Sequence, residues 1–402
     1  MSAVQLDERK VHVDDLKPGM FVHRLDRDWL GLPFPLEGFL LEQNGELDVL
    51  RKHCDFVFVD LERSRVPVLA GLPEAYAGQE ARKRYSNQVE LAEELPWVRN
   101  QHARTRQLVA QVLCDLRAGR KLNLVNVQEA VVPVVQSVLR HADAYLWVNV
   151  LKKRDGYEFA HAMNNSLLAA VFGRHMGYPE ATLVALATGG LLLDVGKTAL
   201  PMELLNKTGP LTDADMALFR SHVEQGLLVL QGTGIRDPEV DVMVRTHHER
   251  FDGSGYPNGL IRNQIPLFGR MAGIIDTFDA MTSDRSFRKA ISPHQALQQI
   301  YRWGDRLFQR ELVEQFMQCL SVYPTGSLIE LSSGEVAIVM AQNQARRLKP
   351  RIMVLTDSHK RLRPSFMEVD LLNQGVSDIP REIAKTIERG AYGLDPTELY
   401  LS

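Results

Sequence analysis

The stretch HHERFDGSGYPNGL, residues 247–260, decides how the centre of this chain is interpreted. Consecutive side chains on an α-helix point about 100° apart, so His247 and His248 cannot face one way within a regular helix. We therefore expect the pair at a helix end, next to the loop DGSGYP that follows it. That loop is rich in glycine, which allows a backbone to approach a ligand closely.

Other potential metal ligands lie at intervals on both sides of the pair, namely His161, Asp194, His222 and Asp276. Two-metal hydrolytic sites need several imidazoles and carboxylates that converge from different helices, with a carboxylate shared between the metals. A single histidine is more often a surface residue or a satisfied core donor. The prediction of a metal site therefore rests on the whole series beside the glycine-rich loop.

The length of 402 residues allows two or three domains. Apolar residues alternate with polar ones up to residue 68, around turn signals such as Pro18-Gly19 and Asn44-Gly45, which predicts short strands. The fold class expected is multidomain α+β. Its expected parts are a β-rich regulatory module at 1–68, a linker and helical connector at 69–150, an all-α metal-binding domain at 151–322, and a β-rich extension at 323–402 with a terminal helix near 379–389.

The composition excludes several classes of protein. With 47 Lys+Arg against 50 Asp+Glu, the chain lacks a basic excess, so RRLKPR at 346–351 is interpreted as solvated sheet surface and no DNA or RNA partner is expected. Three separated cysteines predict a reducing, cytoplasmic setting. The longest uncharged apolar run, Ala181 to Leu193, has 13 residues. Crossing a bilayer takes about 20, and the N-terminus shows no signal-peptide pattern, so no membrane partner is expected.

Local signals also place individual residues. Thr212 followed three residues later by Asp215 is typical of a capped helix start, so a helix is predicted to begin near Asp213 and to carry His222. His175 and His294 fall at a predicted helix end and helix start.

These last two histidines are therefore interpreted as surface or capping residues. The acidic residues Asp279 and Asp284 are interpreted as capping residues that form ion pairs with Arg285 or Arg288, in preference to extra metal ligands.

Taken together, these segments resemble the HD-GYP family of metal-dependent phosphohydrolases. The resemblance covers about residues 155–320 and is carried by LLLDVGKTALP, LLNKTGPLT, HHERFDGSGYPNGL and IIDTFDAMTSDRSFRKA. The N-terminal segments DLKPGMFVHRLDRDWL and PFPLEGFLL are similar to a small domain of unknown function often found ahead of HD-GYP domains. The resemblance implies a helical domain with a two- or three-metal centre, typically of iron or manganese. It further implies hydrolysis of cyclic di-GMP to pGpG or onward to GMP.

The family's pattern implies roles for individual residues. The implied metal ligands are His161, Asp194, His222, His247, His248 and Asp276, with Asp194 bridging. Lys197 matches the lysine that contacts the scissile phosphate, and Gly255, Tyr256 and Pro257 match the loop that names the family. Arg285 and Arg288 fall where the family places basic residues on substrate phosphate or guanine. Arginine suits bidentate phosphate contact, although solvated surface charge is an equally good interpretation of these two.

Two positions depart from that pattern. Leu193 stands where the family has the histidine of its His-Asp pair, so one ligand of the first metal is missing. Tyr157 stands where three-metal members have a glutamate, with Glu158 one position off, so two divalent ions, iron or manganese, are expected.

The function predicted is therefore a metal-dependent cyclic di-GMP phosphodiesterase weakened at its first metal. The alternatives are a catalytically degenerate protein that acts as a nucleotide-binding sensor or scaffold, or a phosphohydrolase for another nucleotide. Protein partners are expected at the GYP loop or the N-terminal domain, and a homodimer is left open.

Overall fold

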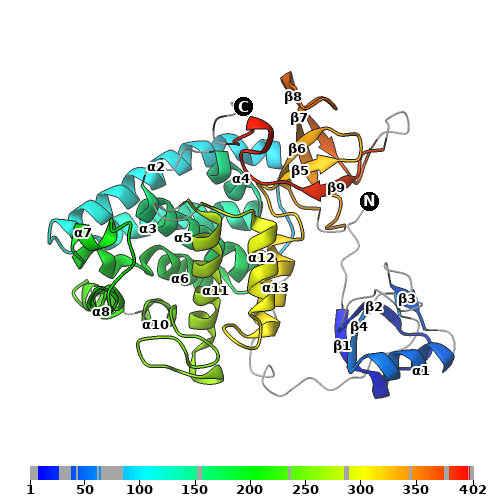
Figure 1. Cartoon of the computed structure of the whole chain (residues 1–402), viewed down its shortest axis with the longest axis horizontal. Helices are drawn as coiled ribbons and strands as arrows, with labels where there is room; N and C mark the ends of the chain where they lie inside the picture. Colours follow the sequence, from blue (N-terminus) through cyan, green and yellow to red (C-terminus); the bar gives the residue numbers. More distant parts are fainter. Residues whose placement is uncertain are drawn as a thin grey trace. The chain divides into compact units, whose positions relative to one another are not determined.

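The structure is a computed structural model of the chain. It describes residues 8–26, 38–41, 44–60, 63–64, 85–151, 156–233, 237–284, 289–343, 346–374, 380–396 and 398. The chain divides into two compact units, Met1–Ala81 and Arg82–Ser402, and each is described by itself (Figure 1).

The first unit is a four-stranded antiparallel sheet with one helix. Its elements are β1 (Glu8–His12), β2 (Phe21–Leu25), β3 (Phe39–Leu40), α1 (Asn44–His53) and β4 (Phe56–Asp60). The strand order is β1-β4-β2-β3. Val22 and Val57 of the strands and Leu50 of α1 are fully buried, because alternate strand residues face the helix. The predicted β-rich module is confirmed, but Asn44-Gly45 begins α1 and forms no turn between strands.

The second unit begins with helices. The longer ones are α2 (Leu91–Arg117), α3 (Leu124–Arg140), α4 (Ala144–Leu151), α5 (Tyr157–His175), α6 (Glu180–Leu192), α8 (Asp213–Arg220), α9 (His222–Gln231), α10 (Pro238–Thr246), α11 (Leu267–Thr282), α12 (Pro293–Arg302) and α13 (Arg310–Leu320), with a single turn at α7 (Met202–Leu205). Figure 1 shows α5 and α6 in the middle of this group.

The central helices α5 and α6 are buried on nearly every side. Phe172 of α5 and Leu183 and Leu186 of α6 are fully buried, as expected for helices that are apolar all round. One apolar cluster joins these helices to α2, α3 and α4, and a second joins them to α11, α12 and α13. The helices of the predicted connector therefore share a core with the metal-binding region.

One segment, Glu180–Ala199, is long and apolar enough by composition to cross a membrane. Of its most apolar window, 61% is buried inside the protein. The segment comprises α6 and the following 3-10 helix Val195–Ala199, which pack against neighbouring helices. It has the burial of a core helix.

The chain ends in a five-stranded antiparallel sheet. Its strands are β5 (Leu328–Leu331), β6 (Val336–Ala341), β7 (Arg351–Thr356), β8 (Leu362–Asp370) and β9 (Ile383–Thr386), in the order β8-β7-β6-β5-β9. The predicted terminal helix is wrong in its described part, because residues 383–386 pair with the edge of β5. A 3-10 turn, Ala391–Gly393, follows. Tertiary pairing has overridden a local helical pattern. The fold class is multidomain α+β, as predicted.

Candidate metal centre

Five elements of the second unit bring the predicted metal ligands together. His161 lies in the second turn of α5 and Asp276 in the middle of α11. Asp194 lies between α6 and the 3-10 helix that follows. His247 is the C-cap of α10, which places the histidine pair at a helix end as predicted. These positions are far apart in sequence, so packing of the helices creates the cluster.

The local structure around His222 differs in part from the prediction. The helix that starts at Asp213 is α8, and its capping box between Thr212 and Asp215 is present as predicted. That helix ends at Arg220, however, and His222 is the first residue of the separate helix α9. The break turns His222 inward, where it is fully buried.

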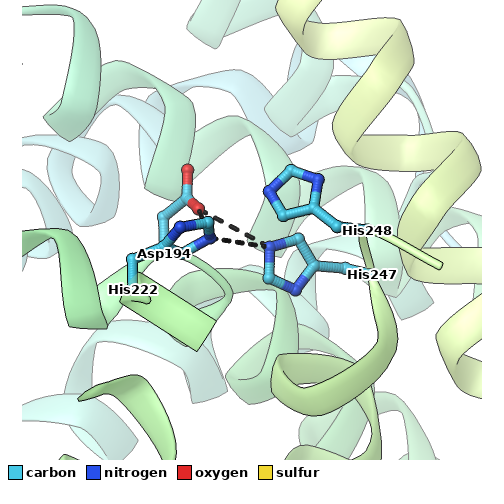
Figure 2. Close-up of side chains that lie close together, drawn as sticks. All are labelled: Asp194, His222, His247 and His248. Atoms are coloured by element: carbon cyan, nitrogen blue, oxygen red, sulfur yellow. Dashed lines mark hydrogen bonds and ion pairs between the residues drawn. The ribbon is translucent and has the colours of Figure 1, made fainter. Parts of the chain in front are cut away.

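The ligand atoms form two groups that share Asp194. In the first group, His161 Nε2 lies 3.2 Å from Asp194 Oδ2 and 3.0 Å from Asp276 Oδ1. In the second, Asp194 Oδ1 lies 3.4 Å from His222 Nε2 and 3.6 Å from His247 Nε2 (Figure 2). The two oxygens of one carboxylate thus face different sets of nitrogens, which is the arrangement of a bridging ligand.

The tautomers of the second group leave lone pairs facing one another. The Nδ1 atoms of His222 and His247 donate to the carbonyl oxygens of Phe219, at 2.6 Å, and Val244, at 2.9 Å. In the neutral rings both Nε2 atoms carry lone pairs, and these atoms are 3.5 Å apart. Burial lowers the pKa of His222 to about 4, so its ring is neutral at pH 7. Facing lone pairs beside a carboxylate oxygen need a cation between them.

Unpaired buried atoms lead to the same conclusion. Among the described residues, Asp194 Oδ1 and His248 Nε2 are buried without a hydrogen-bond partner. His248 lies next to the others, with its ring 5.0 Å from that of His222 between centroids. Buried polar atoms are normally satisfied. Imidazole and carboxylate donors with unused lone pairs fit divalent metal ions.

His161 is oriented by a residue that sequence reasoning misassigned. Its Nδ1 donates to Asp279 Oδ2 at 2.6 Å, so its Nε2 faces the ligand cluster. Asp279 is buried, and Asn164 and Ser283 donate to its other oxygen. The predicted capping role of Asp279 is wrong. The three-residue spacing from Asp276 was the available signal, since it places both carboxylates on one face of α11.

The carboxylates around His161 also govern its charge. Burial disfavours the imidazolium, but Asp194, Asp276 and Asp279 outweigh burial and raise the pKa of His161 well above its ordinary value. Burial likewise opposes the charge on Lys197, yet Asp194 and Asp276 raise the pKa of that ammonium. Lys197 Nζ donates to Asp194 Oδ2. The site therefore holds excess negative charge that a cation would neutralise.

The structure describes the surroundings of both residues that depart from the family pattern. Leu193 is buried among apolar side chains that include Phe172 and Met243. Tyr157 stacks on His161, with 5.2 Å between ring centroids. Glu158 forms an ion pair with Arg117 of α2, on the edge of the helical unit.

The glycine-rich loop begins directly at the histidine pair. A Cβ on Gly255 would lie 2.3 Å from Arg250 N and 2.5 Å from the carbonyl oxygen of His248, so only glycine fits. Tyr256 donates its backbone N–H to that same oxygen and stacks on the His248 ring, with 4.6 Å between centroids. Pro257 follows. The loop therefore lies against the metal-ligand cluster.

Glu249 anchors this loop and was missed from the sequence. It is 4% exposed, and its carboxylate accepts from the backbone N–H groups of Asn258, at 2.8 Å, and Leu260, at 2.9 Å. Its place directly after His248 was the only signal available.

The guanidinium of Arg220, at the end of α8, lies 4.9 Å from the centroid of the Tyr256 ring.

The remaining predicted residues lie elsewhere. Arg285 and Arg288 fall outside the described residues. His175 ends α5 and pairs with Gln315 at 3.2 Å, while His294 starts α12 and donates to the carbonyl of Val322, so both lie away from the cluster as predicted. Asp284 accepts from the backbone of Ala290.

Comparison with known proteins agrees with this geometry. A family model described as "HD domain" matches residues 147–312, and one described as "Domain of unknown function (DUF3391)" matches residues 8–127. The helical fold and its His/Asp cluster define an HD-domain protein.

Curated relatives give the family. The protein named cyclic di-GMP phosphodiesterase PA4108, of Pseudomonas aeruginosa, is 32% identical over 380 residues, 92% of this chain and 90% of that one. The response regulator RpfG of Xanthomonas campestris, also named a cyclic di-GMP phosphodiesterase, is 33% identical over 42% of this chain and 45% of that one. A Vibrio cholerae protein named 3'3'-cGAMP-specific phosphodiesterase 2 is 32% identical over 43% of this chain and 34% of its own. The chain belongs to the HD-GYP family.

Proposed function

We propose that this protein is a metal-dependent phosphodiesterase that hydrolyses cyclic di-GMP to pGpG, GMP or both. The observation that carries the proposal is the pair of ligand groups that share Asp194, since one carboxylate between two sets of nitrogens suits a two-metal hydrolytic site. The relative that matches along almost the whole chain bears the name of this activity.

Six residues are the proposed ligands of two divalent ions. The first ion would be held by His161, Asp194 and Asp276, and the second by Asp194, His222, His247 and His248. We propose iron or manganese, because imidazole suits iron and carboxylate oxygen suits manganese. When bound, such ions polarise phosphoryl oxygens and lower the pKa of water.

The remaining proposed roles belong to side chains that bind and orient the diester. Lys197 is half-buried beside Asp194 and carries a positive charge that would contact the scissile phosphate. Arg285 and Arg288 are proposed to hold phosphate or guanine. Gly255, Tyr256 and Pro257 form the loop beside His248, and the Tyr256 ring offers an aromatic edge to a guanine base.

The other parts of the chain are proposed to regulate this activity. We assign a regulatory module to residues 1–68, a helical connector to 69–150, the phosphohydrolase domain to 151–322 and an extension to 323–402, in a cytoplasmic protein. Contacts with partner proteins would involve the GYP loop or the N-terminal module.

The test is a turnover assay on the purified full chain. Protein reconstituted anaerobically with Fe(II) or Mn(II) is incubated with cyclic di-GMP, and pGpG and GMP are followed by chromatography. The same assay with 3'3'-cGAMP tests the substrate, because one relative is named for that dinucleotide. Product from cyclic di-GMP in wild type and none in Asp194→Asn is expected. Nucleotide binding without any product would overturn the enzyme in favour of a sensor or scaffold.

A further inference from the structure

Asn165 carries a buried amide that protein groups satisfy only in part. It lies one helical turn after His161 on α5 and is fully buried. Its side-chain Nδ2 is 3.1 Å from His161 Nε2, while its Oδ1 is buried with no hydrogen-bond partner among the described residues. An unsatisfied buried polar group costs about 1–3 kcal/mol. The described residues therefore satisfy only half of this amide.

The atoms around His161 Nε2 have the spacing of a coordination shell. Asp276 Oδ1 is 3.0 Å away, the Asn165 amide 3.1 Å and Asp194 Oδ2 3.2 Å. Ligands about 2.1 Å from one ion are roughly 3.0 Å apart at octahedral angles and about 3.4 Å apart at tetrahedral angles. The three separations fall within that range, so the Asn165 amide occupies the same shell as the carboxylates.

The amide can present its oxygen to that shell. A half-turn about the last side-chain bond exchanges the oxygen and nitrogen of an asparagine. Because the outer amide position has no partner among the described residues in either orientation, the half-turn gives up only the contact with His161. His161 Nδ1 donates to Asp279, which leaves Nε2 as the ring atom that faces the amide and the two carboxylates. An inward amide oxygen would lie among three donor atoms that a divalent cation can bind, and such a cation displaces any proton on Nε2.

Asn165 also lies near the position of the missing histidine. A Cβ on Gly190 would be 2.5 Å from the backbone oxygen of Asn165, so α6 passes directly against α5 at this residue. One turn further along α6 come Leu193 and Asp194. Leu193 itself belongs to the apolar cluster. An amide on α5 thus lies beside the helix end where the family pattern places an imidazole.

We propose that Asn165 is a metal ligand that replaces the absent histidine, its amide oxygen completing the first site with His161, Asp194 and Asp276. The inference rests on the proposed two-metal function. The first site then has one nitrogen and three oxygen donors, and the second has three imidazoles and one carboxylate. Oxygen donors suit manganese, whereas imidazole also suits iron and zinc. The first site therefore suits manganese better than the second site does.

The test compares metal binding by the full-length wild type with Asn165→Leu, which keeps volume without a donor, and Asn165→Asp, which keeps an oxygen. Each protein is loaded anaerobically with Mn(II) and desalted. Metal content is measured, and the exchange-coupled signal of a Mn(II) pair is recorded by electron paramagnetic resonance. Ser166→Ala is the matched control, because Ser166 is the next buried residue of α5 and lines a small internal cavity with Thr105 and Met163.

We expect two ions per chain and a coupled signal in wild type, Asn165→Asp and Ser166→Ala. Asn165→Leu is expected to keep one ion, with first-site affinity at least about 10–100-fold weaker, the loss that even outer-shell partners cause. Thermal unfolding of the metal-free proteins controls for misfolding. Two tightly bound ions in Asn165→Leu would overturn the role of Asn165 while leaving the phosphodiesterase intact. A wild type that binds one ion would also overturn it, and turnover would then decide the proposed function separately.

Discussion

Asp279 Oδ2 accepts a hydrogen bond from His161 Nδ1 across 2.6 Å, although 118 residues separate the two in the chain. This bond sets the tautomer of His161 and directs its Nε2 to Asp194 and Asp276. Carboxylate partners of this kind fix the orientation of metal-binding imidazoles and raise their basicity. The aspartate therefore positions a ligand without being one.

Replacing Asp279 should weaken the first metal site selectively. Asp279→Ala leaves His161 free to rotate and removes a buried charge, so first-site affinity should fall about 10–100-fold. Calorimetric titration with Mn(II) measures both sites. Asp284→Asn is the control, since the hydrogen bond described for Asp284 is one accepted from the backbone of Ala290. Equal losses at both sites would show that Asp279 maintains the fold and does not position His161.

Asp194 and His222 should have distinguishable effects on metal content. Asp194→Asn removes the carboxylate shared by both ligand groups, so both ions should be lost and turnover should fall at least about 100-fold. His222→Ala should remove only the second ion. Metal analysis of the desalted proteins checks both outcomes. Retention of two ions in Asp194→Asn would contradict the bridging role.

Gly255→Ala should displace the loop that follows the histidine pair. The added methyl group would meet backbone atoms of Arg250 and His248, which cannot move independently. Overpacking of this kind costs about 1–3 kcal/mol, and the Tyr256 contact with His248 should loosen. Thermal unfolding and turnover measure the two effects. Gly209→Ala is the control, because no atom of the described residues lies within 4 Å of a Cβ placed there, and an equal loss would contradict this explanation.

Glu335 should make the C-terminal sheet sensitive to acid. Its carboxylate pairs with Arg363 of β8 and with Arg381, just ahead of β9, so it links the two edges of the sheet. Burial opposes its charge, but Arg381, Ser333 and Arg363 outweigh burial and hold the pKa of Glu335 below its ordinary value of 4.5. The stabilisation is therefore complete above that value and is lost as the pH falls through the folded-state pKa.

Glu335→Gln should accordingly destabilise the protein at pH 7 by roughly 1.5–3 kcal/mol, the usual scale for hydrogen bonds to charged groups. The difference from wild type should shrink as the pH falls below 4.5. Urea unfolding at a series of pH values measures it. The exposed Glu382 provides a matched Glu→Gln control. A constant difference across the pH range would exclude the ion pairs as its source.

Features that depend on neighbours in sequence could be predicted. The capped start at Thr212, the helix end at His247 and the alternating strands of the first unit follow from side-chain hydrogen bonding, helix geometry and a period of two. The donor types of the metal-ligand cluster are equally plain in the sequence, because only imidazoles and carboxylates recur at these positions.

Features that depend on distant packing could not be predicted. The strand β9 exists because β5 offers an unpaired edge, and the break before His222 appears only once α8 and α9 are placed. Asp279 resembles an ordinary polar residue of a helix until α11 packs on α5 and brings it to His161. Asn165 is one turn from His161 on the same helix, but its neighbourhood of ligands appears only once Asp194 and Asp276 are brought there. The amino-acid sequence by itself determined the chemistry of the donors and the local elements. Tertiary structure decided which donors converge and what orients them, because those energies come from contacts between segments more than 100 residues apart.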